Sequence, residues 1–116
     1  MNQNLGMKLI TYPVQDIAQA KKFYRQLLGV EPYADAPYYV GFRIGETEIG
    51  LVPNGRKQGM TGPLGYFQVS DIRNCLKSLV EAGAQVDQQA RDVGGGRLVA
   101  SVMDADGNTI GLFQDP

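Results

Sequence analysis

Asp104-Ala105-Asp106-Gly107-Asn108-Thr109-Ile110-Gly111-Leu112 is the segment of this 116-residue chain that is most informative about its fold. Its first half predicts a tight turn, because Asp, Gly and Asn tolerate left-handed backbone angles and bond their own backbone. Its second half predicts an apolar strand that begins at Thr109. The same Ile-Gly-Leu core occurs earlier, at Ile49-Gly50-Leu51. This repetition indicates that a structural unit is duplicated within the chain.

A strand followed by a capped helix is also repeated. Met7–Val14 predicts a strand, and the helix after it begins at the N-cap Asp16 and ends at Gly29. Leu64–Val69 predicts a second such strand, and its helix begins at Asp71 and ends at Gly83. Both helices therefore follow their strands at the same spacing.

Apolar residues recur at helical spacing in both helices, which predicts that each packs one face against a sheet. The first apolar stripe consists of Ile17, Ala20, Phe23, Tyr24, Leu27 and Leu28. The second consists of Ile72, Cys75, Leu76, Leu79 and Val80. Lys21, Lys22 and Arg25 fall between the apolar positions and are expected on the solvated side.

About three antiparallel strands are expected after each helix. In the first half these include Tyr38–Ile44 and Thr47–Val52, after a polar, turn-rich segment at 31–37. In the second half they are a short strand or bend at 85–90, then Arg97–Met103 and Thr109–Phe113.

The predicted fold class is therefore α+β, with two βαβββ modules at residues 7–55 and 62–115. A Gly- and Pro-rich linker joins them at 56–61. Half a chain of this size buries too little surface to be stable alone, so we expect the two modules to pack together.

Composition limits the partners and the compartment. Eleven basic and twelve acidic residues nearly cancel, so we expect neither nucleic acid nor a membrane as a partner. The lone Cys75 cannot form an internal disulfide, which suits a reducing cytoplasm. Residues 1–6 lack the cationic and apolar regions of a signal peptide, and no apolar run approaches the ~20 residues that span a bilayer. A soluble cytoplasmic protein is expected.

The chain contains no histidine. It therefore lacks the commonest metal ligand in proteins and the usual general base at neutral pH. Serine–histidine and cysteine–histidine nucleophile arrangements are excluded for the same reason.

Three motifs together resemble the vicinal oxygen chelate superfamily, which contains glyoxalases, bleomycin-resistance proteins and extradiol dioxygenases. The motifs are Val14-x-Asp16, the helix end Phe23-Tyr24-x-x-Leu27-Leu28-Gly29, and Asp104-x-Asp106-Gly107-Asn108-x-Ile110-x-Leu112. The resemblance covers residues 7–114. It implies paired βαβββ modules whose curved, mixed sheets form a cup.

The same resemblance implies four metal-ligand positions, two in each module. They map onto Leu9, Gly50, Leu64 and Gly111. Leu has no lone pair to offer and Gly has no side chain, so none of these residues can bind a metal. We expect no metal and no other cofactor.

Strand alternation predicts which side chains would line the cup. Thr11 lies on the same strand face as Leu9. Glu48 and Val52 lie on the same face as Gly50. Tyr66 and Gln68 lie on the same face as Leu64. The predicted ligand-binding residues are Thr11, Glu48, Tyr66 and Gln68. Apolar walls with a few orienting polar groups suit a small molecule, and a neutral or weakly acidic aromatic compound is expected. The alternative is that the leucines fill the cup with core, and both alternatives stay open.

Other candidate sites have structural explanations. Asp104-x-Asp106 lacks the glycine spacing of a calcium loop and predicts a hairpin turn. Gly94–Gly96 predicts a flexible connector, and Cys75 predicts a core residue. Arg97 is expected at the surface, although it could clamp a carboxylate. Glu48 is the one carboxylate considered as a general base.

The predicted function is a metal-independent binder of a small organic molecule, as the resemblance to bleomycin-resistance proteins implies. The alternative is a lyase- or dioxygenase-type enzyme of the same superfamily that uses an unrecognised metal set or none, with catalytic residues unknown. A third possibility is an accessory protein that acts through its dimer surface. A homodimer is expected, because curved sheets in so short a chain leave surface that a second copy can cover.

Overall fold

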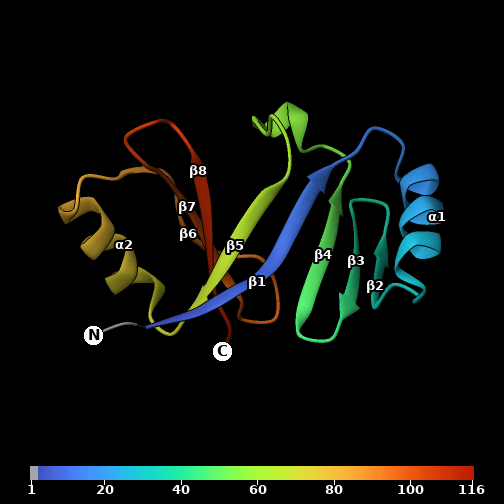
Figure 1. Ribbon diagram of the computed structural model, residues 1–116, viewed down its shortest axis with the longest axis horizontal. Coiled ribbons are helices and arrows are strands. Elements are labelled where there is room, and N and C mark those ends of the chain that lie inside the picture. The colour runs from blue at the N-terminus through green and yellow to red at the C-terminus, as the bar shows by residue number, and fades with distance from the viewer. Residues whose placement is uncertain (1–2) are drawn as a thin grey trace. The chain divides into compact units, whose positions relative to one another are not determined.

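The computed structural model describes residues 3–116 (Figure 1). Contacts divide this part of the chain into two compact units. One unit is Lys8–Leu64, and the other combines residues 3–7 with Gly65–Pro116.

The first βαβββ module follows the predicted order. Its elements are β1 (Asn4–Pro13), α1 (Ile17–Leu28), β2 (Ala34–Ala36), β3 (Tyr39–Ile44), β4 (Thr47–Val52) and a 3₁₀ helix at Arg56–Gln58. The strands lie in the order β2-β3-β4-β1. β4 pairs in parallel with β1, whereas the β2–β3 and β3–β4 pairings are antiparallel.

The second module repeats this arrangement. Its elements are β5 (Leu64–Val69), α2 (Ile72–Glu81), β6 (Gln85–Asp92), β7 (Leu98–Met103) and β8 (Thr109–Gln114). The strands lie in the order β5-β8-β7-β6, with β8 parallel to β5 and the other pairings antiparallel. In both modules the last strand therefore returns beside the first, and the predicted βαβββ repeat is confirmed.

Both helices begin at the predicted aspartates. A side-chain oxygen of Asp16 accepts a hydrogen bond from the backbone N–H of Gln19 at 3.0 Å, and Asp71 accepts one from Asn74 at 3.1 Å. The side chain of Gln114 also accepts a bond from the backbone N–H of Ile72 at 2.7 Å. These bonds satisfy amide groups that the first helical turn leaves without partners.

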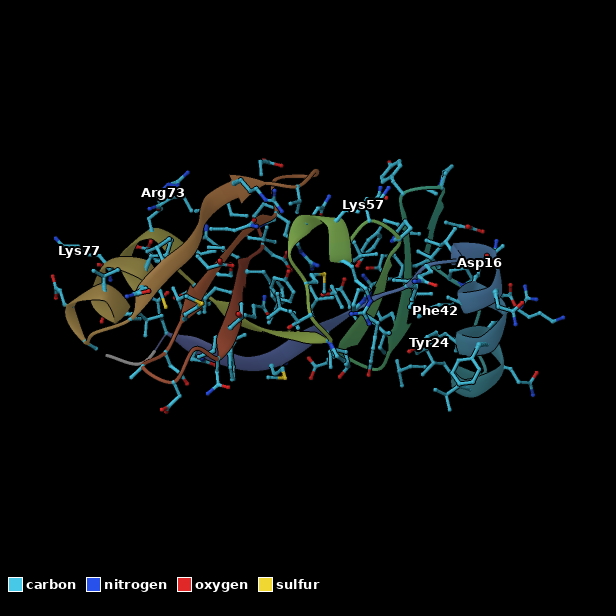
Figure 2. The ribbon with its side chains drawn as sticks, turned by 90° about the horizontal axis from the view of Figure 1, so that it is seen from above. Asp16, Tyr24, Phe42, Lys57, Arg73 and Lys77 are labelled. Atoms are coloured by element: carbon cyan, nitrogen blue, oxygen red, sulfur yellow. The ribbon has the colours of Figure 1, made fainter. Side chains whose placement is uncertain are left out.

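The core of the Lys8–Leu64 unit lies between α1 and its strands. Its buried residues are Val40, Phe42, Ile49 and Leu51, and Ile17, Ala20, Tyr24 and Leu28 pack on them from α1 (Figure 2).

The predicted first stripe is wrong for Phe23 and Leu27, which are 60% and 64% exposed. The packed residues of α1 follow the i, i+3, i+7, i+11 spacing of one helix row. Phe23 and Leu27 each lie one residue, or about 100°, around the helix from Tyr24 and Leu28 and so point past the sheet.

The Gly65–Pro116 unit has an equivalent core under α2. Its buried residues are Val69, Ile72, Leu76, Ala100, Val102 and Leu112, and Phe67 and Ile110 are among the side chains packed against them. The two Ile-Gly-Leu strands are thus used in the same way. Isoleucine and leucine face the helix, and the glycine between them faces the opposite side of its strand.

Three elements differ from the sequence prediction. β2 lies within the segment expected to be irregular, because three residues are too few to show a strand period. β6 is a full strand of eight residues, although its register with β7 shifts twice. β1 begins at Asn4, earlier than the apolar pattern suggested.

The predicted hairpin turn is confirmed in detail. One carboxylate oxygen of Asp104 accepts hydrogen bonds from the backbone N–H groups of Asp106 and Asn108, each at 2.9 Å. The other oxygen accepts one from the side-chain amide of Asn108, also at 2.9 Å. Gly107 has the positive φ of 82° that the turn requires. In the described residues, no helix is long and apolar enough to span a membrane.

The hydrogen bonds to Asp104 predict a pH effect. The side-chain amide of Asn108, followed by its backbone N–H, lowers the pKa of Asp104 below its ordinary value of 3.8. The turn is therefore stabilised at full strength above about pH 4 and loses that contribution as the pH falls through the lowered pKa. An NMR titration of the Asp104 carboxyl carbon should show the lowered midpoint, and Asn108→Ala should raise it towards 3.8. An unchanged midpoint in that variant would contradict this account, and Asn54→Ala serves as the control.

Candidate functional site

In the Lys8–Leu64 unit, the strand face opposite α1 carries the predicted site residues. Strand pairing places Leu9 beside Glu48, and Thr11 beside Gly50. β3 adds Gly41 beside Gly50 and Arg43 beside Glu48. Paired residues of adjacent strands project from the same face of a sheet. We call this surface, made of Leu9, Thr11, Tyr39, Gly41, Arg43, Glu48 and Gly50, the Glu48 face.

A buried carboxylate is the main charge of the Glu48 face. Glu48 is 7% exposed, and its Oε1 accepts a hydrogen bond from the hydroxyl of Tyr33 at 2.6 Å. A guanidinium nitrogen of Arg43 lies 4.0 Å from its Oε2. Both contacts compensate a carboxylate that would be costly to bury alone.

The ring of Tyr33 packs against two residues of β3. The Arg43 guanidinium lies 4.3 Å from the ring centroid, and a Cβ at Gly41 would lie only 2.8 Å from the ring carbon Cζ. Burial raises the pKa of the Tyr33 hydroxyl well above its ordinary value, and the hydrogen bond to Glu48 raises it further. Tyr33 therefore stays protonated and acts as the donor to Glu48 at any physiological pH.

Gly50, one of the mapped ligand positions, is covered by an aromatic ring. A Cβ built at Gly50 would lie 2.7 Å from Cζ and 2.8 Å from Cε1 of Tyr39. Real Cβ atoms do not approach other atoms so closely. The ring of Tyr39 therefore occupies the space that a side chain at position 50 would need.

Thr11 supplies a hydroxyl on the same face with no protein partner. The residue is 5% exposed, and its Oγ1 has no hydrogen-bond partner among residues 3–116. Buried hydroxyl groups are nearly always hydrogen-bonded, to water or to a bound molecule if not to protein. The Thr11 hydroxyl can therefore bond a water molecule or a polar ligand atom.

The Gly65–Pro116 unit has a matching surface opposite α2. Tyr66 pairs with Gly111, and Gln68 with Phe113. A Cβ at Gly111 would lie 2.6 Å from Cγ and 2.8 Å from Cε2 of Tyr66. The ring of Tyr66 thus covers Gly111 as that of Tyr39 covers Gly50. We call the surface made of Tyr66, Gln68, Ser101, Gly111 and Phe113 the Tyr66 face.

Part of the Tyr66 face is filled by protein. Phe113 is 1% exposed and lies beneath the guanidinium of Arg97, which is 4.5 Å from its ring centroid. Arg97 also forms a two-point pair with Asp115, at 2.6 and 3.1 Å. Arg97 therefore binds a carboxylate, as the sequence suggested it could, but this carboxylate is the side chain of Asp115. Ser101 donates a hydrogen bond to Asp87 at 2.8 Å.

The structure places the predicted site residues on two surfaces. Thr11 and Glu48 share the Glu48 face, whereas Tyr66 and Gln68 share the Tyr66 face. One cup lined by all four residues remains a prediction.

Cys75 packs half-buried against the α2 core, and burial, followed by the charge of Asp71, raises the pKa of its thiol. The thiol is therefore a poor nucleophile.

Sequence reasoning missed Tyr33, Tyr39 and Arg43. The alternation of 39–44 contained a usable signal for two of them, because Val40 and Phe42 are apolar and Tyr39 and Arg43 must then face the other way. Tyr33 lies in an irregular segment, where no period predicts the direction of a side chain.

The four mapped ligand positions do not fit a divalent metal. Leu9 is 5% exposed and aliphatic, Leu64 is half-buried and aliphatic, and aromatic rings cover the two glycines. Within residues 3–116, no group of three or more His, Cys, Asp or Glu side chains converges. Such a metal needs several imidazole, thiolate or carboxylate ligands at one point.

A family model of the Glyoxalase/Bleomycin resistance protein/Dioxygenase superfamily matches residues 6–112. No curated protein matches the chain by sequence.

Several solved structures share the fold. Methylmalonyl-CoA epimerase from Mycobacterium tuberculosis is 18% identical with a TM-score of 0.76, over 100% of this chain and 91% of that chain. A glyoxalase/bleomycin resistance protein/dioxygenase superfamily member from Vibrio splendidus is 17% identical with a TM-score of 0.70, over 92% and 97% of the two chains. The Mn(II)-bound glyoxalase from Novosphingobium aromaticivorans is 17% identical with a TM-score of 0.72, over 99% of this chain and 40% of that chain. These similarities confirm the predicted α+β fold class.

The covered glycines predict a specific stability effect. Gly111→Ala should destabilise the protein by about 1–3 kcal/mol, because the new methyl group overlaps the ring of Tyr66 near its base, where the ring has least freedom to move. Urea denaturation measures the effect. Gly62→Ala is the control, since a Cβ there meets no atom within 4 Å. If the cost of Gly111→Ala is the same in a Tyr66→Ala background, the ring is not its cause.

Proposed function

The chain belongs to the glyoxalase/bleomycin resistance protein/dioxygenase superfamily, and within it we propose a metal-independent binder of a small organic molecule in the cytoplasm. The resemblance predicted from the sequence is confirmed by the family match, which spans nearly all of both modules.

The paired tyrosines over the two glycines carry this proposal. Where the superfamily's metal-dependent members have ligand side chains, this chain presents the rings of Tyr39 and Tyr66. An aromatic face stacks on flat organic groups and offers nothing to a divalent metal. The hydroxyl of Thr11 and the amide of Gln68 supply hydrogen bonds that would orient such a guest. A neutral or weakly acidic aromatic compound matches these surfaces.

The alternative is a lyase- or dioxygenase-type enzyme of the same superfamily that uses an unrecognised metal set or none. The buried Glu48, bonded to Tyr33 at 2.6 Å, is the observation that favours it, because a buried carboxylate can serve as a general base. Tyr33 and Arg43 already contact the two carboxylate oxygens of Glu48, which favours a structural role for this residue. Binding without turnover separates the first function from the second.

Metal analysis tests the metal-independent part. Protein purified without chelator should contain well under one equivalent of zinc, nickel, manganese or iron, because the mapped ligand positions offer no donor atoms. Mass spectrometry of the acid-digested protein gives the metal content. One tightly held equivalent, lost on chelation together with an activity, would support the enzyme instead.

An aromatic probe tests the binding part. Tyr66→Ala should weaken the binding of 2-naphthol by about 1–3 kcal/mol if the naphthol stacks on the ring. Fluorescence titration measures the affinity. Tyr38→Ala is the matched control, because Tyr38 is 74% exposed and has no part in either face. Equal affinities of wild type and Tyr66→Ala would place the ligand elsewhere or indicate that the face is packed shut.

We also propose a homodimer. Phe23 and Leu27 form an exposed apolar pair on α1 that a second copy could cover. Light scattering at about 50 μM should give twice the chain mass, and Phe23→Ser with Leu27→Ser should reduce it if this pair lies in the interface. A monomer mass for the wild type would refute the dimer.

A further inference from the structure

A groove lies on the helix side of the Gly65–Pro116 unit, between α2 and β6. Its volume of about 570 Å³ falls within the range of small-molecule sites, roughly 300–1,000 Å³. Tyr66 and Gly111 belong to β5 and β8 and lie on the face of the strands opposite α2, so the groove is separate from the Tyr66 face.

The groove has an apolar floor. Leu76 and Val80 supply it from α2, and Val86 and Ala90 supply it from β6. Leu76 is 6% exposed, whereas Val80 is 47% exposed even though it belongs to the apolar stripe of α2. The α2–β6 packing therefore leaves apolar surface open within the groove.

An irregularity in β6 shapes this floor. The register between β6 and β7 shifts between Val86 and Gln88 and again between Gln88 and Arg91. As a result, the consecutive residues Gln89 and Ala90 both line the groove, which regular strand alternation would not allow. Strand bulges redirect side chains in this way and are enriched beside binding sites.

Two cations without ion-pair partners among the described residues line the α2 side of the groove. Arg73 and Lys77 lie one turn apart on α2, and both project outward from it (Figure 2). Within residues 3–116, neither has an ion-pair partner. Arg73 is in the first turn of α2, where the helix dipole adds positive potential. Glu81, one turn beyond Lys77 in the last turn of α2, adds a negative charge at the C-terminal end of this helix row.

We propose that this groove binds a small amphipathic monocarboxylate. The carboxylate pairs with Arg73 and Lys77, and the apolar body lies along Leu76, Val80, Val86 and Ala90. The charge pattern sets both the class and the orientation of the ligand. A second acidic group that approached Glu81 would be repelled, so dicarboxylates are disfavoured.

Decanoate below its micelle concentration is a suitable probe, and its binding can be mapped by amide NMR shifts. Saturable shifts should be confined to α2 and β6. Acetate, which lacks the apolar body, and decanol, which lacks the charge, should each bind at least about fivefold more weakly. Raising the salt from about 0.05 to about 0.5 M should weaken decanoate binding, because both cations are exposed.

Variants test the residues directly. Arg73→Ala with Lys77→Ala should weaken decanoate binding about threefold to tenfold or more, and Lys77→Gln alone should weaken it less. Val80→Ser tests the floor and should also weaken binding. Lys22→Ala, an exposed cation on α1, is the matched control and should leave the affinity unchanged. Amide spectra of each variant confirm that it is folded.

Three results would overturn the proposal. The first is decanoate shifts that map to Tyr39 or Tyr66 rather than to α2 and β6. The second is wild-type affinity in the folded double variant. The third is binding only to decanoate-containing lipid vesicles, which would make the surface a membrane contact. 2-Naphthol binding and its loss in Tyr66→Ala are measured independently of decanoate, so failure of the groove and failure of the proposed function can be told apart.

Discussion

The alternation of side chains along β4 and β8 is the constraint on which the structure of each unit depends. Ile49 and Leu51 pack under α1, and Ile110 and Leu112 pack under α2. Burying each of these side chains contributes about 2 kcal/mol. A one-residue slip of either strand would expose its apolar pair, so the register is firmly set. The same register forces Gly50 and Gly111 to the opposite face.

A glycine on that face leaves room for an aromatic ring, and in both units a tyrosine ring fills that room. Tyr39 lies over Gly50 from β3, and Tyr66 lies over Gly111 from β5. Tyr39 is on the third strand of the first module and Tyr66 is on the first strand of the second, so the two tyrosines are not equivalent positions of the repeat. The packing requirement is common to both, because an uncovered glycine in a strand leaves backbone without side-chain contacts. Glycine at positions 50 and 111 thus leaves no side chain on this face and makes room for an aromatic ring there.

Charged side chains have partners within the chain on the Glu48 and Tyr66 faces, in contrast to the α2–β6 groove. On the Glu48 face the buried carboxylate is compensated by Tyr33 and Arg43, which makes that cluster internally satisfied. On the Tyr66 face, Arg97 likewise forms an ion pair with Asp115. The α2–β6 groove differs, since Arg73 and Lys77 remain without ion-pair partners among residues 3–116 and face solvent beside an apolar floor. The groove thus has charge left for a partner outside the chain.

Features that depend on neighbouring residues could be predicted from the amino-acid sequence alone. Helix starts at Asp16 and Asp71, the Asp104 turn and the βαβββ repeat all follow from caps, turn chemistry and periodicity, which act over a few positions. The sequence also showed that Leu9, Gly50, Leu64 and Gly111 cannot hold a metal, since residue type alone decides that. Tertiary structure decided what covers those positions, which half of the α1 stripe is buried, and which partners Glu48 and Arg97 have. These depend on strand register and on contacts between segments far apart in the chain, and no local pattern encodes them.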